Sequence, residues 1–278
     1  LKVKAFIRSL PPGHIQNLFK TAFLSIIETI STHRKAGNGV KRKTKQNQLS
    51  LLGDTAVDRV RKYTHHYLKM YLEDLMTGFD SDNAVFIEGS SLDMSSLKIS
   101  GTFNAVLTSP PYANCFDYSK IYMCELWMGD FFTNAESQKN FRMQSVRSHV
   151  HATWPSRYED KGSELINELI YPLLREKELW SRSIPDMLKG YFMDIGQLLS
   201  SLSSLVEPES PVGLVVGNSV YGGIPIATDL LISETAERYG FRTECIEVYR
   251  HIVPSSQQYV QMNDKEFLRE SMVVLRKL

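Results

Sequence analysis

Two adjacent prolines in the stretch Leu-Thr-Ser-Pro-Pro-Tyr, residues 107–112, constrain the fold more than any other feature of the chain. Proline has no amide hydrogen and a fixed φ, and it forces the residue before it into extended geometry. The apolar run Phe-Asn-Ala-Val-Leu, residues 103–107, therefore predicts a strand over 103–108 that ends at a rigid corner. Ligands of open α/β sheets lie just beyond the carboxyl ends of strands. The corner at 109–112 is thus the first candidate site.

Composition places the chain among globular proteins and excludes several classes. It has 278 residues, 42% of them hydrophobic and 23% charged. No apolar window is long enough for a membrane span, and no signal-peptide pattern is present, so we expect no membrane partner. The three cysteines, Cys115, Cys124 and Cys245, are too few for a disulfide framework or a zinc site, which favours a reducing, cytoplasmic setting. The net charge of +1 confines any nucleic-acid affinity to local patches.

Hydrophobic periodicity predicts an α/β fold in two parts. Residues 1–79 form a helical segment, and residues 80–278 form the domain that contains the double-proline corner. Expected helices cover 12–33, 55–77, 116–132, 163–178, 185–205 and 225–240. Expected strands cover 84–89, 103–108, 211–219, 242–250 and 271–278, with the last two forming a closing pair.

Two polar regions have two interpretations each. Residues 33–48, with six Lys or Arg, are either a solvated loop or a flexible arm for phosphate backbones, with Lys41, Arg42 and Lys43 as contacts. Residues 133–183 are polar and irregular. They are either ordinary surface or a target-recognition insertion that uses basic and aromatic side chains, namely Arg142, Arg147, His149, His151, Trp154 and Arg157. His149 and His151 alone are too few ligands for a metal site, and we expect none.

The Thr-Ser-Pro-Pro-Tyr segment resembles the catalytic motif of amino-group DNA methyltransferases, in the Ser-Pro-Pro-Tyr form associated with cytosine-N4 methylation. Further segments resemble the same family in the same order: EGSSLDM before the motif, FDYSKIYMCELWMGDF after it, then YFMDIGQLL, PVGLVVGNSVYGGIPI, VYRHIVPSSQQY and RESMVVLRK. The resemblance covers residues 80–278 well and the N-terminal helices more loosely.

This resemblance implies a Rossmann-like sheet, S-adenosylmethionine as cofactor and DNA as partner. It assigns catalysis to Ser109, Pro110, Pro111 and Tyr112. The Ser109 hydroxyl and Pro110 carbonyl would accept the hydrogens of an exocyclic amine, and Tyr112 would stack on a base extruded from the duplex. The cofactor candidates are Glu88, Ser90, Asp93 and Thr108, and the candidates for contacts to the base or DNA are Asp117, Tyr118 and Asn218. Asp117 and Tyr118 could equally cap the helix that follows.

Two expected features of the family are missing from this sequence. The Phe-x-Gly-x-Gly turn that holds the methionine part of the cofactor is not found, and neither are the first strands of the sheet. Three explanations are open: a C-terminal portion of a longer protein, half of a split enzyme whose upstream partner supplies the turn, or a degenerate copy. The leucine start favours the first two.

These features leave three functions open. The first is methylation of DNA, with cytosine N4 preferred over adenine N6, in a restriction–modification setting. The second is an RNA or tRNA amino-methyltransferase, which has a similar loop. The third is a non-catalytic nucleic-acid-binding subunit.

Overall fold

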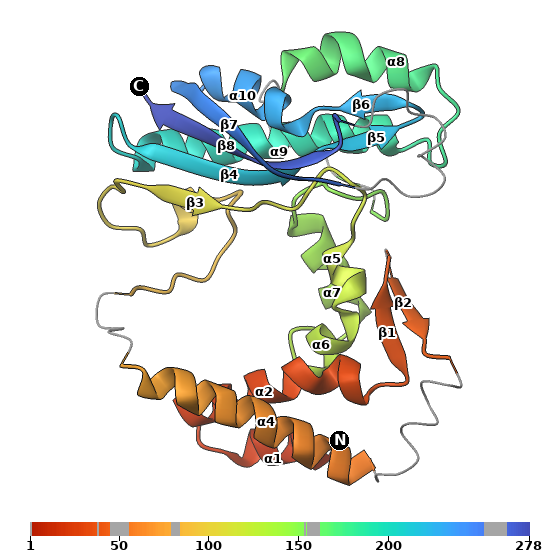
Figure 1. The fold of residues 1–278 in the computed structure, drawn as a ribbon, viewed down its shortest axis with the longest axis vertical. Coiled ribbons are helices and arrows are strands. Elements are labelled where there is room, and N and C mark those ends of the chain that lie inside the picture. Colours follow the sequence, from red (N-terminus) through yellow and green to blue (C-terminus); the bar gives the residue numbers. More distant parts are fainter. Residues whose placement is uncertain are drawn as a thin grey trace. The chain divides into compact units, whose positions relative to one another are not determined.

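The computed structural model describes residues 2–37, 39–44, 56–78, 84–152, 154, 162–252 and 266–278. The chain forms two compact units, Leu1–Phe86 with Asp117–Phe141, and Ile87–Phe116 with Arg142–Leu278. Figure 1 labels the elements of both. The domain boundary that the sequence predicts between residues 79 and 80 stays a prediction. No helix among the described residues is long and apolar enough to cross a membrane.

The first unit is built on two helices that pack through apolar faces. The expected helices over 12–33 and 55–77 correspond to α2 (His14–Ile30) and α4 (Ala56–Met76), which pack against each other. α2 buries Phe23, Ile26 and Ile27 at helical spacing, and Tyr63 and Tyr67 of α4 pack against that cluster. The unit also contains α1 (Lys2–Ser9), α5 (Tyr118–Ile121) and α6 (Met123–Met128).

The basic segment 33–48 was expected to be a loop or flexible arm, and this is wrong for residues 33–42. They form an antiparallel hairpin of β1 (His33–Ala36) and β2 (Gly39–Arg42), with His33 opposite Arg42. Gly37 has φ 56° and makes the tight turn that joins the strands. Cross-strand hydrogen bonds thus order a segment whose composition alone indicated a loop. Residues 45–48 lie outside the described residues.

The second unit contains a mixed four-stranded sheet in the order β3-β4-β8-β7. β3 (Val106–Thr108) lies parallel to β4 (Pro211–Gly217), and β8 (Arg269–Lys277) lies antiparallel to both β4 and β7 (Phe241–His251). Two helices, α9 (Ile184–Leu205) and α10 (Thr228–Glu237), contact each other and pack on one face of this sheet (Figure 1). The expected α/β class and the closing strand pair are confirmed.

Two expected strands differ from those observed. Residues 84–88 form no strand, and Val85 and Phe86 are 82% and 95% exposed, because no neighbouring strand among the described residues pairs with them. The strand expected over 103–108 is limited to β3, while Phe103 forms an isolated parallel bridge with Val206 at the end of α9. The prolines end β3 at the expected place.

Two further segments are more regular than the sequence indicated. The polar stretch 133–183 contains a helix that was not expected, α7 (Ala135–Gln144), whereas the helix expected over 163–178 corresponds to a π-helical turn η2 (Ile166–Ile170) followed by α8 (Tyr171–Arg175). The glycine-rich stretch after β4 is a second hairpin, β5 (Ser219–Tyr221) and β6 (Ile224–Ile226). Gly222 and Gly223 have positive φ and form its turn. Residues 153 and 155–161, including Arg157, lie outside the described residues.

A buried ion pair fixes the chain after α7 onto α9. The backbone N–H and Nε of Arg147 donate to Oδ2 of Asp194 at 2.8 and 3.1 Å, and Nη2 donates to Oδ1 at 2.8 Å. Both side chains are almost completely buried. A Cβ at Gly190 would lie 2.8 Å from Cδ of Arg147, so the glycine makes room for the arginine. The sequence-based suggestion that Arg147 contacts DNA is wrong, because Asp194 occupies its guanidinium inside the unit.

Removing one partner of this pair is expected to destabilise the second unit. Asp194→Ala leaves the Arg147 charge buried without its counter-ion, at a cost of about 3–5 kcal/mol in the free energy of unfolding. Glu73→Ala, which breaks the exposed Lys69–Glu73 pair on α4, is the control and should cost about 0.5 kcal/mol or less. Urea denaturation measures both. Equal effects of the two substitutions would show that the buried pair has no special structural role.

Candidate active site

The double-proline corner begins where β3 ends, beside the middle of β4. The register pairs Thr108 with Leu214, and the next residue, Ser109, donates its hydroxyl hydrogen to the carbonyl oxygen of Val215 at 3.2 Å. Ser109 is exposed and Pro110 is buried. Because the hydroxyl hydrogen points into the sheet, the oxygen lone pairs remain able to accept hydrogen bonds from outside.

Tyr112 is packed against β4 by a close contact with a glycine. A Cβ at Gly217 would lie 2.9 Å from Cδ2 and 3.1 Å from Cε2 of the Tyr112 ring, so only glycine allows the ring this position. Burial raises the pKa of the Tyr112 hydroxyl more than its hydrogen bond with Ser109 lowers it. The nearby Glu270 carboxylate raises this pKa further, so the phenol is neutral at pH 7. Glu270 of β8 is held by an ion pair with Arg250 of β7 at 2.9 Å. Gly217, Glu270 and Arg250 were not predicted individually, although the segments that contain them resemble the family.

The turn after Tyr112 is held by two hydroxyls of β5. Ser219 Oγ and Tyr221 OH both donate to the Ala113 carbonyl oxygen, at 2.8 and 2.9 Å. Cys115, in the same turn, has φ 61° and is buried. Burial raises the pKa of its thiol to about 11, so the thiol is protonated at neutral pH and does not act as a nucleophile. Ser219 and Tyr221 were not predicted individually, although the segment that contains them resembles the family.

Asn218, predicted to contact the target base, is engaged within the protein. Its side-chain nitrogen donates to Asp229 Oδ1 and to the Phe267 carbonyl, and its side-chain oxygen accepts from the Asp229 backbone N–H. Burial raises the pKa of Asp229, but hydrogen bonds from Arg269, Ser271 and Asn218 outweigh burial, so this pKa lies below its ordinary value. The arrangement makes Asn218 a support of the β4–β5 connection.

Asp117 and Tyr118, the other predicted base contacts, start a helix in the first unit. Asp117 is buried, and its Oδ1 accepts from the Lys120 backbone N–H and from Ser119 Oγ. This is the N-cap of α5. Tyr118 is the first residue of that helix and is exposed. The structure therefore favours the helix-cap interpretation of Asp117.

The predicted cofactor residues precede the corner in sequence and fit the cofactor only in part. Glu88 and Ser90 are exposed, Ser90 Oγ accepts from the Leu92 N–H, and Asp93 Oδ1 accepts from Ser95 Oγ next to η1 (Met94–Ser96). Carboxylates of this kind can accept hydrogen bonds from adenosine. No glycine-rich turn follows a strand before this point in the described residues, so nothing there would hold the methionine part. The described residues also contain no group of three His, Cys, Asp or Glu suited to a metal ion.

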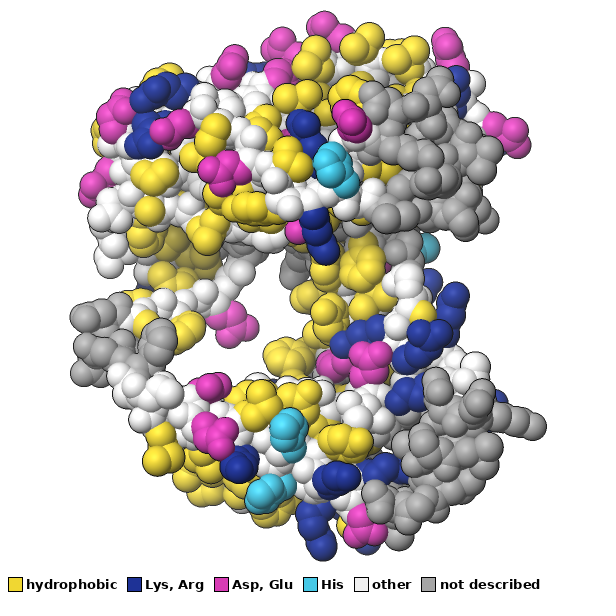
Figure 2. All heavy atoms as spheres, in the orientation of Figure 1, with side chains coloured by type: hydrophobic (Ala, Val, Ile, Leu, Met, Phe, Trp, Pro, Cys, Tyr) yellow, Lys and Arg dark blue, Asp and Glu magenta, His cyan; other side chains and the backbone are white. Residues whose placement is uncertain are grey.

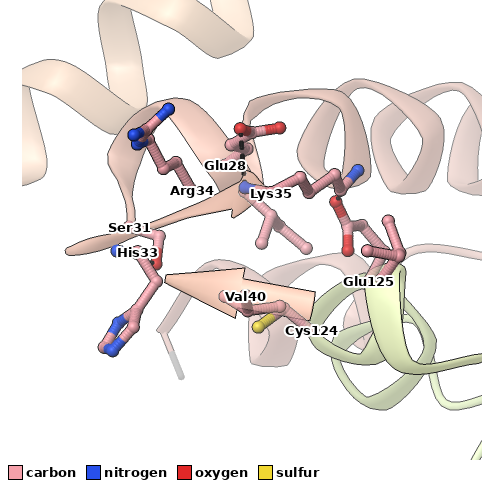
Figure 3. Close-up of a pocket in the computed structure, with 10 residues that line it drawn as sticks. Glu28, Ser31, His33, Arg34, Lys35, Val40, Cys124 and Glu125 are labelled. Carbon is pink, nitrogen blue, oxygen red and sulfur yellow. Dashed lines mark hydrogen bonds and ion pairs between the residues drawn. The ribbon is translucent and has the colours of Figure 1, made fainter. Parts of the chain in front are cut away.

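The basic side chains of the hairpin divide into structural and exposed ones. Lys35 points to Glu125, with which it forms an ion pair at 2.6 Å, and its backbone N–H donates to Glu28 (Figure 3). Lys43 Nζ donates to the carbonyls of Glu28 and Thr29 at the end of α2. His33, Arg34, Lys41 and Arg42 are exposed. The hollow in Figure 3 holds only about 10 Å³, too little for more than a water molecule.

Gly217→Ala is expected to destabilise the protein by about 1–3 kcal/mol, because the new methyl group overlaps the Tyr112 ring. In a Tyr112→Ala background most of this cost should disappear. A double-mutant cycle measured by urea denaturation gives the coupling free energy. Additive costs of the two substitutions would mean that Tyr112 does not pack as described.

Comparison with known proteins gives a consistent group of relatives. The chain is 27% identical over 302 residues to the Type II methyltransferase M.AvaI of Nostoc sp. (strain PCC 7120) and to M.AvaI of Anabaena variabilis, covering 99% of this chain and 62% of each relative. It is 27% identical over 196 residues to the Type II methyltransferase M.BsoBI of Geobacillus stearothermophilus, covering 63% of this chain and 38% of the relative. No family model and no solved structure matches. The chain thus spans less than two thirds of the length of the M.AvaI proteins, and it is similar to Type II methyltransferases over nearly its whole length.

Proposed function

We propose that the chain is the catalytic portion of an S-adenosylmethionine-dependent DNA methyltransferase that modifies an exocyclic amine, with cytosine N4 as the preferred target. The observation that supports this most is the corner 109–112, where Ser109 is anchored to Val215 and Tyr112 is packed against Gly217. The similarity to Type II methyltransferases supports the same reaction class.

The chemistry requires acceptors around the amine. The lone pair of an exocyclic amine is delocalised into the base, and acceptors for its two hydrogens favour the tetrahedral geometry in which nitrogen is nucleophilic. Ser109 Oγ and the Pro110 carbonyl are the two acceptors, and the prolines keep them in place without reorganisation. S-adenosylmethionine, when bound, supplies the methyl group.

The aromatic ring of Tyr112 stacks on the base. A base reaches this corner only after leaving the duplex, which costs a few kcal/mol. Stacking on an aromatic ring contributes roughly 1–3 kcal/mol per base and offsets part of that cost. The neutral phenol and the ring fixed by Gly217 suit this role.

The proposal includes further strands that pair with the open edge of β3. β3 pairs with β4 alone among the described residues, and Leu107 in β3 is 76% exposed. An open strand edge with an apolar side chain favours pairing with further strands. We infer that a polypeptide segment or partner adds strands at β3 and supplies the glycine turn for the cofactor.

The basic hairpin is proposed as a contact to the DNA backbone. Figure 2 shows Lys and Arg side chains gathered over β1 and β2, and Lys41 and Arg42 are exposed there. Lys43, also predicted to bind DNA, caps α2 and is the weaker candidate.

Ser109→Ala and Tyr112→Ala are each expected to lower methyl transfer by about 100-fold or more, since each removes a group that acts on the amine or the base. The measurement is transfer of labelled methyl groups to DNA by the chain together with the segment or partner proposed to complete its sheet, followed by analysis of the modified nucleosides. Leu230→Ala, a change at an exposed position on α10, is the control for folding. N4-methylcytosine as product supports the proposal, whereas N6-methyladenine changes the target and methylated RNA alone rejects DNA as the substrate.

Replacing Lys41 and Arg42 with glutamine should weaken DNA binding and reduce the slope of log K against log salt concentration by about 1 for each lost phosphate contact. Lys69→Gln on α4 is a matched control, because Lys69 is an exposed cation outside the hairpin. Anisotropy titrations at several salt concentrations give the slopes. A slope unchanged from the wild-type value would make the hairpin an ordinary surface feature.

A further inference from the structure

A second cavity lies in the unit that contains the double-proline corner. Its volume is about 430 Å³, within the range of small-molecule sites. It is lined by the segment after Arg147 and by the first half of α9, with His149, Trp154, Asp186, Met187, Lys189 and Met193 among the lining residues.

The direction of α9 places this cavity at the functional edge of the sheet. Phe103, before β3, bridges to Val206 at the end of α9, so the helix ends where β3 begins. α9 packs on the sheet and runs back along it, and its first turns therefore lie toward the carboxyl end of β3, where ligands of α/β sheets bind.

One wall of the cavity is aromatic and held by hydrogen bonds. The ring centroids of His149 and Trp154 are 5.1 Å apart, and Trp154 Nε1 donates to the His149 carbonyl at 3.3 Å. The His151 backbone N–H donates to Nδ1 of His149, so the neutral imidazole has its proton on Nε2. His149 is buried, with His151 stacked on its ring, and it holds the partly accessible Trp154 ring in place before any ligand arrives.

The first turns of α9 contribute an acceptor, Asp186, and a cation, Lys189, to the cavity lining. Asp186 Oδ1 accepts from Tyr171 OH at 2.8 Å, and Lys189, one helical turn later, lies 5.7 Å from the centroid of the same tyrosine ring. Arg147 also lines the cavity, but Asp194 neutralises its charge. Met193, which is partly accessible, supplies polarisable apolar surface.

We propose that this cavity binds a nucleobase with an exocyclic amine, separate from the base that reacts at Ser109. A flat ring fits against Trp154, the amine donates to Asp186, and Lys189 donates to a ring nitrogen or carbonyl oxygen. This rests on the proposed function, within which the cavity would read a base beside the target. The same chemistry is present in the adenine of S-adenosylmethionine, so the test separates the two sources.

The test measures binding to the intact protein. Anisotropy titration uses a labelled single-stranded oligonucleotide, and calorimetry uses adenosine, cytidine, thymidine and S-adenosylmethionine. Trp154→Ala should weaken binding roughly tenfold, and Trp154→Phe should retain most of it, because an aromatic ring remains. Asp186→Asn should weaken binding of cytidine or adenosine but not of thymidine, which has no exocyclic amine. Trp180→Ala, at an exposed tryptophan that does not line the cavity, should bind as wild type.

Each outcome decides the proposal. A loss confined to the oligonucleotide assigns the base to DNA, and a loss confined to adenosine and S-adenosylmethionine assigns it to the cofactor. Wild-type affinity in both Trp154→Ala and Asp186→Asn overturns the proposal, and if Trp154→Ala does not fold, the exposed Asp186 still decides. Because binding is read without methyl transfer, failure here leaves the proposed function standing. Absence of methyl transfer by the chain completed with the proposed segment or partner, with base binding intact, rejects only the proposed function.

Discussion

The parallel pairing of β3 with β4 is the constraint on which the candidate site depends. Three residue pairs, Val106 with Val212, Leu107 with Gly213 and Thr108 with Leu214, set the register, and Ser109 therefore meets Val215. A slip of one residue would turn every side chain of β3 to the other face and move Ser109 away from its acceptor. The two prolines then stop the strand immediately after this contact. Strand register and proline chemistry together fix where the corner lies.

Side-chain contacts between residues far apart in the sequence then hold the corner in place. The sequence could therefore predict the corner but not the contacts that support it. The corner and the order of its flanking elements follow from local features, the apolar run and the two prolines. The contacts of Ser219 and Tyr221 with Ala113 join residues 106 and 108 positions apart, and no local pattern encodes them. The glycine at 217 likewise has a packing role that becomes visible only beside Tyr112.

Basic residues in the polar segments of this chain have different structural environments, for a physical reason. Arg147 and Lys43 are basic residues in polar segments, which is also the pattern of a nucleic-acid contact. One is instead paired with Asp194 inside the second unit, and the other caps α2. A buried cation requires a partner, and that partner is distant in sequence or is a backbone carbonyl. Lys41 and Arg42 differ because they are exposed, and only exposed cations can exchange counter-ions for phosphates.

The exposed edge of the sheet at β3 favours the addition of further strands. One face is covered by α9 and α10, and the buried side chains of β8, Ser271, Val273 and Leu275, alternate with more accessible ones. A short strand such as β3, paired on one side among the described residues and with Leu107 exposed, has little hydrogen bonding of its own to hold it. Added strands at β3 would both protect that edge and stiffen the corner that follows it. Completion of the sheet and ordering of the double-proline corner would then be one physical event, coupled through Thr108 and Ser109.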